Sequence, residues 1–150
     1  MNALEILRTN RRILTDIVTG LTEEQIEIIP QGFNNNILWN VLHVIVSQQI
    51  LHYKLSGLDL LVDNDIVESC RKGTSPANWQ STPSLKKHFN LLAELPDALE
   101  QDYNSNKFEN FQTYMTSTGF ELKNIDDAIQ FNNFHEGIHT GVILALRKFV

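Results

Sequence analysis

Hydrophobic residues recur every three or four positions in four long stretches of the chain, and this spacing is the period of an amphipathic helix. The first stretch runs from Leu4 and Leu7 through Ile17 and Val18. The pattern predicts four long helices, at residues 3–19, 37–55, 83–103 and 125–148.

Residues that start and stop helices bound these stretches. Gly20 is placed to end the first, and Thr22 opens a T-E-E-Q capping box that predicts a short helix before Pro30. One of three consecutive Asn residues at 34–36 caps the second helix, and Thr82 and Asn124 are placed to cap the third and the fourth. Pro96 is a candidate kink within the third.

Two long segments without a helical period separate these elements. Residues 58–81 are rich in turn formers and carry room for a short helix near Leu60, whereas residues 107–122 contain a T-S-T-G turn. No internal repeat or flexible linker divides the chain. We therefore expect a single domain over residues 1–150, all-α, built as a four-helix bundle with long connections.

Composition excludes some classes of protein. The chain has 150 residues, 42% of them hydrophobic, and a net charge of −6, which disfavours nucleic acid as a partner. The densest basic patch, Arg8, Arg11 and Arg12, is interpreted as a solvated face of the first helix. No apolar run is long enough to span a membrane, and the N-terminus has no signal core, so a cytoplasmic protein without membrane contact is expected.

The single cysteine, Cys70, has no partner for an internal disulfide. Nothing around it in the sequence indicates a thiol of lowered pKa. We interpret it as a structural or surface residue.

Two histidines in the last predicted helix are spaced to share a metal ion. His135 and His139 are four residues apart, so both imidazoles lie on one face of the helix, on the stripe that should be buried. The segment H-E-G-I-H resembles the pentad of zinc proteases, in which the glutamate is the general base. No His, Asp, Glu or Cys follows His139, so a third ligand has to come from upstream.

His43 is the best upstream candidate, because it lies on an apolar stripe of the second predicted helix. His52 points about 180° away from it on the same helix, and His88 lies beside two lysines and is expected to face water. Three imidazoles suit Zn²⁺, Ni²⁺, Cu²⁺ or Fe²⁺ and leave a coordination position for water. The alternative is that each histidine is a core residue hydrogen-bonded to a neighbour.

Other residues near this candidate site allow more than one interpretation. Trp39 could roof a pocket beside the ion or belong to the core, and we favour the core. Glu136 could support a ligand, act as a base or be a solvated carboxylate, and the solvated interpretation is preferred. Gly137 and Gly141 weaken a helix, which suggests that another helix or a pocket approaches closely.

Two segments together resemble the DinB/YfiT-like superfamily. They are N-I-L-W-N-V-L-H (36–43) and H-E-G-I-H-T-G (135–141), and the order of the remaining segments, including T-S-T-G, is similar over nearly the whole chain. The resemblance implies an up-down-down-up bundle, often a homodimer, that binds nickel or zinc through three histidines, which here are His43, His135 and His139. The family pattern does not require a glutamate at position 136.

The resemblance also implies a range of activities. Relatives include transferases and an isomerase that use low-molecular-weight thiols, and others described as metal-dependent hydrolases. We therefore expect a metal-dependent enzyme, of thiol S-transferase or hydrolase type, acting on a small electrophilic substrate. One alternative is a non-catalytic metal-binding or stress-response protein with a structural ion. Another is a zinc protease, but this sequence lacks the third ligand that such proteases have downstream of the pentad.

Overall fold

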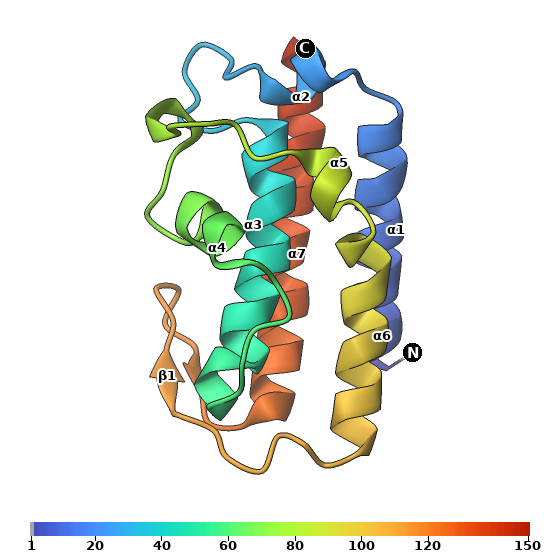
Figure 1. The fold of residues 1–150 in the computed structure, drawn as a ribbon, viewed down its shortest axis with the longest axis vertical. Helices are drawn as coiled ribbons and strands as arrows, with labels where there is room; N and C mark the ends of the chain where they lie inside the picture. The colour runs from blue at the N-terminus through green and yellow to red at the C-terminus, as the bar shows by residue number, and fades with distance from the viewer. Residues whose placement is uncertain (1) are drawn as a thin grey trace.

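A computed structural model describes residues 2–150, and four long helices run side by side in it (Figure 1). In Figure 1, α1 and α7 rise while α3 and α6 descend, which is the expected up-down-down-up order. The prediction of an all-α four-helix bundle is confirmed. The four helices are α1 (Ala3–Thr19), α3 (Ile37–His52), α6 (Leu91–Asn104) and α7 (Ile125–Leu146).

Side chains cap three helices where the sequence predicted. Thr22 forms a capping box with Gln25 at the start of α2 (Glu23–Glu27). Asn36 accepts from the Trp39 N–H at 2.7 Å, and Asn124 accepts from the Asp127 N–H at 2.9 Å. Each cap satisfies a backbone donor that has no partner within its own helix.

The third predicted helix is two helices. Ser84, not Thr82, caps α5 (Leu85–His88), and the chain then turns so that α6 begins at Leu91. The break reorients α5 relative to the apolar stripe of α6, so the expectation that His88 faces water is wrong. His88 is only 7% exposed, and its Nδ1 lies 2.8 Å from the Ser84 carbonyl oxygen.

Both long connections carry short elements. The first contains α4 (Asn64–Cys70) and η2 (Pro76–Asn78), so its α-helix lies after the position expected near Leu60. The turn η1 (Lys54–Ser56) precedes this connection, where the second predicted helix was expected to end. The second connection contains an antiparallel pair of strands that the sequence did not predict, β1 (Tyr114–Met115) and β2 (Glu121–Leu122). A last turn, η3 (Arg147–Phe149), follows α7.

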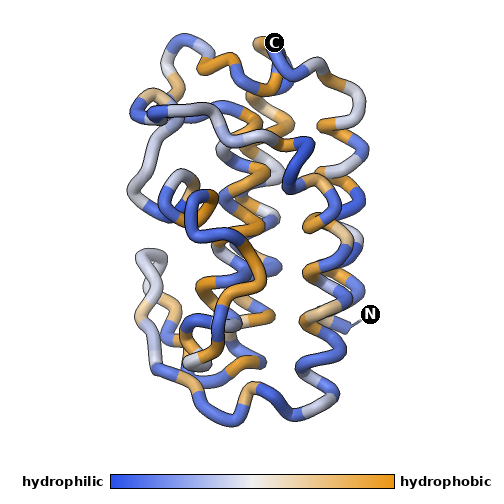
Figure 2. The backbone as a smooth tube through the Cα atoms, viewed as in Figure 1, coloured by the Kyte–Doolittle hydropathy of each residue, from blue (hydrophilic) through white to orange (hydrophobic). Residues whose placement is uncertain are grey.

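Helix α3 is the centre of the core. It packs against α7, α4 and α2, and Val41, Leu42, Val44 and Ile45 are fully buried. The outer helices α1 and α6 have a solvated side, and Figure 2 shows hydrophobic and polar positions alternating along them. Within residues 2–150, no helix is both long and apolar enough to cross a membrane.

Candidate metal centre

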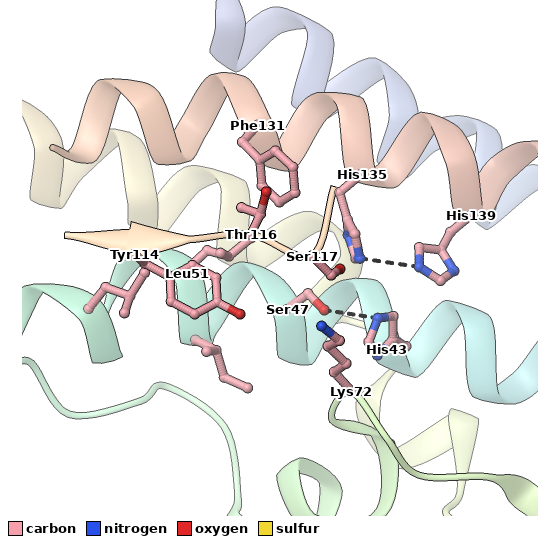
Figure 3. Close-up of a pocket in the computed structure, with 12 residues that line it drawn as sticks. His43, Ser47, Leu51, Lys72, Tyr114, Thr116, Ser117, Phe131, His135 and His139 are labelled. Carbon is pink, nitrogen blue, oxygen red and sulfur yellow. Dashed lines mark hydrogen bonds between the residues drawn. The ribbon is translucent and has the colours of Figure 1, made fainter. Parts of the chain in front are cut away.

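The three selected histidines meet between α3 and α7 (Figure 3). His43 comes from α3, and His135 and His139 come from successive turns of α7. Each offers a ring nitrogen, and these atoms all lie within 4.8 Å of one another. The Nε2 atoms of His135 and His139 are 3.2 Å apart. One ion can therefore be reached by all three rings, and this was the geometry expected from the sequence.

Neighbouring groups orient two of the rings. His43 donates from Nδ1 to the Cys70 carbonyl oxygen at 2.7 Å, and His139 donates from Nδ1 to Asn40 Oδ1 at 2.8 Å. Each bond places the proton on Nδ1, so Nε2 carries the lone pair that a metal ligand requires. In this structure Nε2 of His43 accepts from the Ser47 hydroxyl at 3.2 Å, and Nε2 of His139 accepts from Nε2 of His135 (Figure 3). Nδ1 of His135 is buried and has no hydrogen-bond partner among the described residues.

Asn40 is a site residue that sequence reasoning missed. It is fully buried, and its amide donates to the Asn36 carbonyl oxygen at 2.7 Å and to Asn35 Oδ1 at 3.0 Å. These bonds turn its Oδ1 toward His139. A buried amide needs partners, so an asparagine inside an apolar helix next to a candidate ligand was the available signal.

Burial keeps the three imidazoles neutral. Burial is the main reason that the pKa of His43 is lowered. It also lowers the pKa of His135 to about 4 and the pKa of His139 to about 3. The charge of the neighbouring histidines adds to the shift for His135 and His139. At neutral pH the rings therefore present lone pairs without first losing protons, which fits a divalent ion.

Trp39 belongs to the core and also supports the site. Its ring stacks on His43 with centroids 4.4 Å apart and planes 11° from parallel. The indole N–H donates to Thr74 Oγ1 at 2.9 Å. The side chain is buried behind His43, so it holds the imidazole in place from the side away from the cavity.

Glu136 is not solvated, and it does not enter the site. Its two oxygens accept from Nε and Nη2 of Arg11 at 3.1 and 2.8 Å, and Asn132 donates to Oε1 at 2.8 Å. Burial raises the pKa of Glu136, while Arg11 and Asn132 oppose that shift by bonding to the charged form. The preferred interpretation of Glu136 as an exposed carboxylate is therefore wrong.

Arg11 is likewise buried, so the interpretation of its basic patch as solvated is wrong at this residue. The side chains of Arg11 and Glu136 are 2% and 0% exposed. Nη2 of Arg11 also donates to Gln48 Oε1 at 2.8 Å and to the Val44 carbonyl oxygen at 3.2 Å. The two charges can be buried because each compensates the other.

Two further expectations concern residues around the site. Gly137 and Gly141 are exposed, and an added Cβ at either would meet no atom within 4 Å, so the expected close approach is wrong. His52 is fully buried but lies outside the histidine cluster, as its position on the helical wheel indicated. Burial lowers the pKa of His52 to about 3.

The histidines open into a cavity of about 310 Å³. One part of its wall is apolar, and another carries hydroxyl groups from α3, from β1 and from the turn after β1 (Figure 3). The sequence did not indicate these lining residues, because a pocket wall assembled from separate elements leaves no local pattern. The apolar residues are Ile50, Leu51, Leu55 and Phe131, and the hydroxyl-bearing residues are Ser47, Tyr114, Thr116 and Ser117.

A four-helix bundle with three converging histidines on two adjacent helices defines a helical protein with a candidate metal site. The profile of the DinB superfamily matches residues 6–143, and the chain belongs to that superfamily. The resemblance noted in the sequence is thereby confirmed. No curated protein matches the chain.

Proposed function

We propose that the protein is a metal-dependent enzyme that transfers a low-molecular-weight thiol to a small electrophilic molecule. The observation that supports this most directly is the position of the histidines in the wall of a cavity. His43, His135 and His139 all line it, so an ion held there would be within reach of a small molecule. A purely structural site is normally closed by protein ligands.

The three imidazoles would hold zinc or nickel through ring nitrogens, and because burial keeps the rings neutral no imidazolium has to lose its charge first. When bound, such an ion supplies a Lewis acid that lowers the pKa of a water or thiol at its open position. The protein's own contribution is to orient the rings through Cys70 and Asn40 and to exclude water with the apolar wall.

The protein offers no thiol of its own for this chemistry. Cys70 is the single cysteine, and its side chain is buried outside the cavity. Burial raises the pKa of its thiol to about 12, so the nucleophilic thiolate is disfavoured. A reacting thiol would therefore have to enter as a substrate.

The cavity wall favours thiol transfer over hydrolysis. Metal-dependent hydrolases commonly use a carboxylate as general base, but no Asp or Glu is among the residues that line this cavity. Glu136, the base of the protease interpretation, is held by Arg11 instead. A thiol needs less help, because coordination to the ion deprotonates it directly.

Turnover by metal-loaded protein tests the proposal. Protein loaded with zinc or nickel is offered cysteine or another small thiol together with a chromogenic aryl halide. We expect thiol-dependent turnover that is lost in His139→Ala, because one of the three ligands is removed. Cys70→Ala should keep the activity, and His88→Ala serves as the histidine control, because His88 is buried away from the cavity.

The outcomes separate the remaining candidates. Histidine-dependent cleavage of an ester without thiol would replace the transferase with a hydrolase. Metal binding without turnover, together with a large drop in melting temperature on chelation, would indicate a structural ion. Cleavage of a protein substrate that is lost in Glu136→Gln would revive the protease interpretation.

A further inference from the structure

Lys72 is a cation on the cavity wall with no assigned role. It lies in the turn that follows α4, and its side chain extends toward Ser47 and His43 (Figure 3). The chain around it is fixed, because Cys70 accepts a hydrogen bond from His43 and Thr74 accepts one from Trp39. The backbone that carries Lys72 is thus attached to α3 on both sides of the lysine.

The turn itself needs a glycine directly after the lysine. Gly73 has φ of +90°, a conformation that side chains disfavour, and the Thr74 N–H donates to the Arg71 carbonyl oxygen at 3.2 Å. Thr74 Oγ1 also donates to that oxygen at 2.8 Å. The short closed turn presents Lys72 to the cavity from a backbone of defined geometry.

Lys72 differs from neighbouring cations in having no carboxylate partner within residues 2–150. Arg71 pairs with Glu68 at 3.1 Å, and Lys87 pairs with Asp63 at 2.7 Å. Lys72 is exposed and forms no ion pair, although the protein as a whole carries a net charge of −6. The unpaired charge is therefore available to a bound molecule.

The charge of the cavity wall has one sign. Among the residues that line it, Lys72 is the only one with a fixed charge, and none is acidic. A divalent ion on three neutral imidazoles would add positive charge to the same space, so the two cations would repel each other. An anionic group bound between them removes that repulsion and gains attraction from both.

We infer that the ligand of this cavity carries an anionic group, a carboxylate in the simplest case, and that Lys72 binds it. The inference rests on the proposed function for the group that meets the histidines. The apolar wall receives the body of the ligand, and Ser47 and Ser117 are placed beside the site as polar contacts (Figure 3). A cavity of about 310 Å³ is at the small end of ligand sites, which indicates a compact acid.

Paired thiols test this without any turnover. Zinc-loaded protein is titrated by calorimetry with unbranched mercaptocarboxylic acids of increasing chain length, and with the corresponding mercaptoamides. At the best chain length, we expect the acid to bind about tenfold more tightly than its amide, the low end for a charge-assisted hydrogen bond because Lys72 is exposed. The preference should weaken with added salt.

Lysine variants assign the preference to its source. Lys72→Met keeps an apolar stem without the charge and should remove most of the preference, whereas Lys72→Arg should keep most of it. Lys86→Met removes an exposed lysine of α5 outside the cavity and should match the wild type. A preference that survives in Lys72→Met arises from chelation by the acid and overturns the inference.

The same titrations separate this inference from the proposed function. If acid and amide bind equally at every chain length, Lys72 does not recognise an anion, while the metal site and thiol binding stand. If neither binds, the inference also fails, and zinc analysis of the same sample shows whether the histidine site fails with it.

Discussion

Helix α7 carries two buried polar clusters on different faces, and they differ in what they leave free. On one face, Glu136 and Asn132 meet Arg11, and the charges of the carboxylate and the guanidinium compensate each other inside the protein. On the other, His135 and His139 meet His43, and one ring nitrogen from each lies within 4.8 Å of the others beside a cavity. The first cluster is closed, because its charges pair with each other, and it stabilises the fold. The second is open to the cavity and is the candidate site for a metal ion.

Removing one charge from the closed cluster should have the largest effect. Arg11→Met leaves the buried Glu136 carboxylate without its cation, and Glu136→Leu leaves the buried Arg11 guanidinium without its anion. We expect each to lower the free energy of unfolding by about 3–5 kcal/mol, measured by urea denaturation. The double variant should recover much of the loss, because no charge is then left unpaired.

If the single variants were nearly as stable as the wild type, the Arg11–Glu136 cluster would not stabilise the fold as stated. If they lost zinc while still folded, the two clusters would not be separate, because the closed cluster would then contribute to the candidate metal site. Zinc content of the folded protein, measured in the absence of urea, decides the second point.

Two buried asparagines provide a matched test of the open cluster. Asn40→Leu removes the acceptor for Nδ1–H of His139, and loss of such an orienting bond typically weakens metal binding 10- to 100-fold. Competition with a chromophoric chelator measures the zinc affinity. Asn132→Leu is the control, because its amide bonds to Glu136 in the closed cluster.

We expect Asn132→Leu to leave the zinc affinity unchanged even where it lowers stability. Equal weakening in both variants would mean that the two clusters respond to general loosening of α7. Asn40 would then have no specific role in orienting His139.

His52 gives the smallest effect, in the pH dependence of stability. Its pKa is lowered to about 3 in the folded protein but is near 6.5 when unfolded, so only the unfolded state gains a proton as the pH falls below 6.5. Its contribution is complete above that pH and decreases by about 1.4 kcal/mol per unit until the pH reaches about 3.

The variant His52→Leu should therefore lose about 2 kcal/mol less than the wild type between pH 6.5 and pH 5. Urea unfolding at both pH values in the presence of a chelator measures this difference without a contribution from metal binding. Identical losses in the two proteins would show that His52 is not kept neutral by the fold.

The helical period and the caps at Thr22, Asn36 and Asn124 could be predicted because both depend on residues close in sequence. Arg11 and Glu136 could not, because each looks like a surface charge until its partner, 125 positions away, is known. Lys72 and the cavity hydroxyls other than that of Ser47 come from turns and short strands without a helical period. The expected homodimer and the cytoplasmic location stay predictions.

The sequence did select the three histidines, because four-residue spacing on one helix and an apolar stripe on another are local patterns. It misjudged Gly137 and Gly141, since a residue that weakens a helix suits an open surface as well as a tight contact. His88 was misplaced for another reason, namely that one long apolar stripe concealed the break between α5 and α6.

Glu136 follows His135 directly, about 100° further round α7. Were the helix to turn by that angle about its own axis, the carboxylate would swing toward α3 and the imidazole would leave it. The bidentate grip of a guanidinium from α1 makes that rotation costly. An ion pair on another face of α7 thus fixes the rotation of the helix about its axis, and with it the direction in which the imidazoles point.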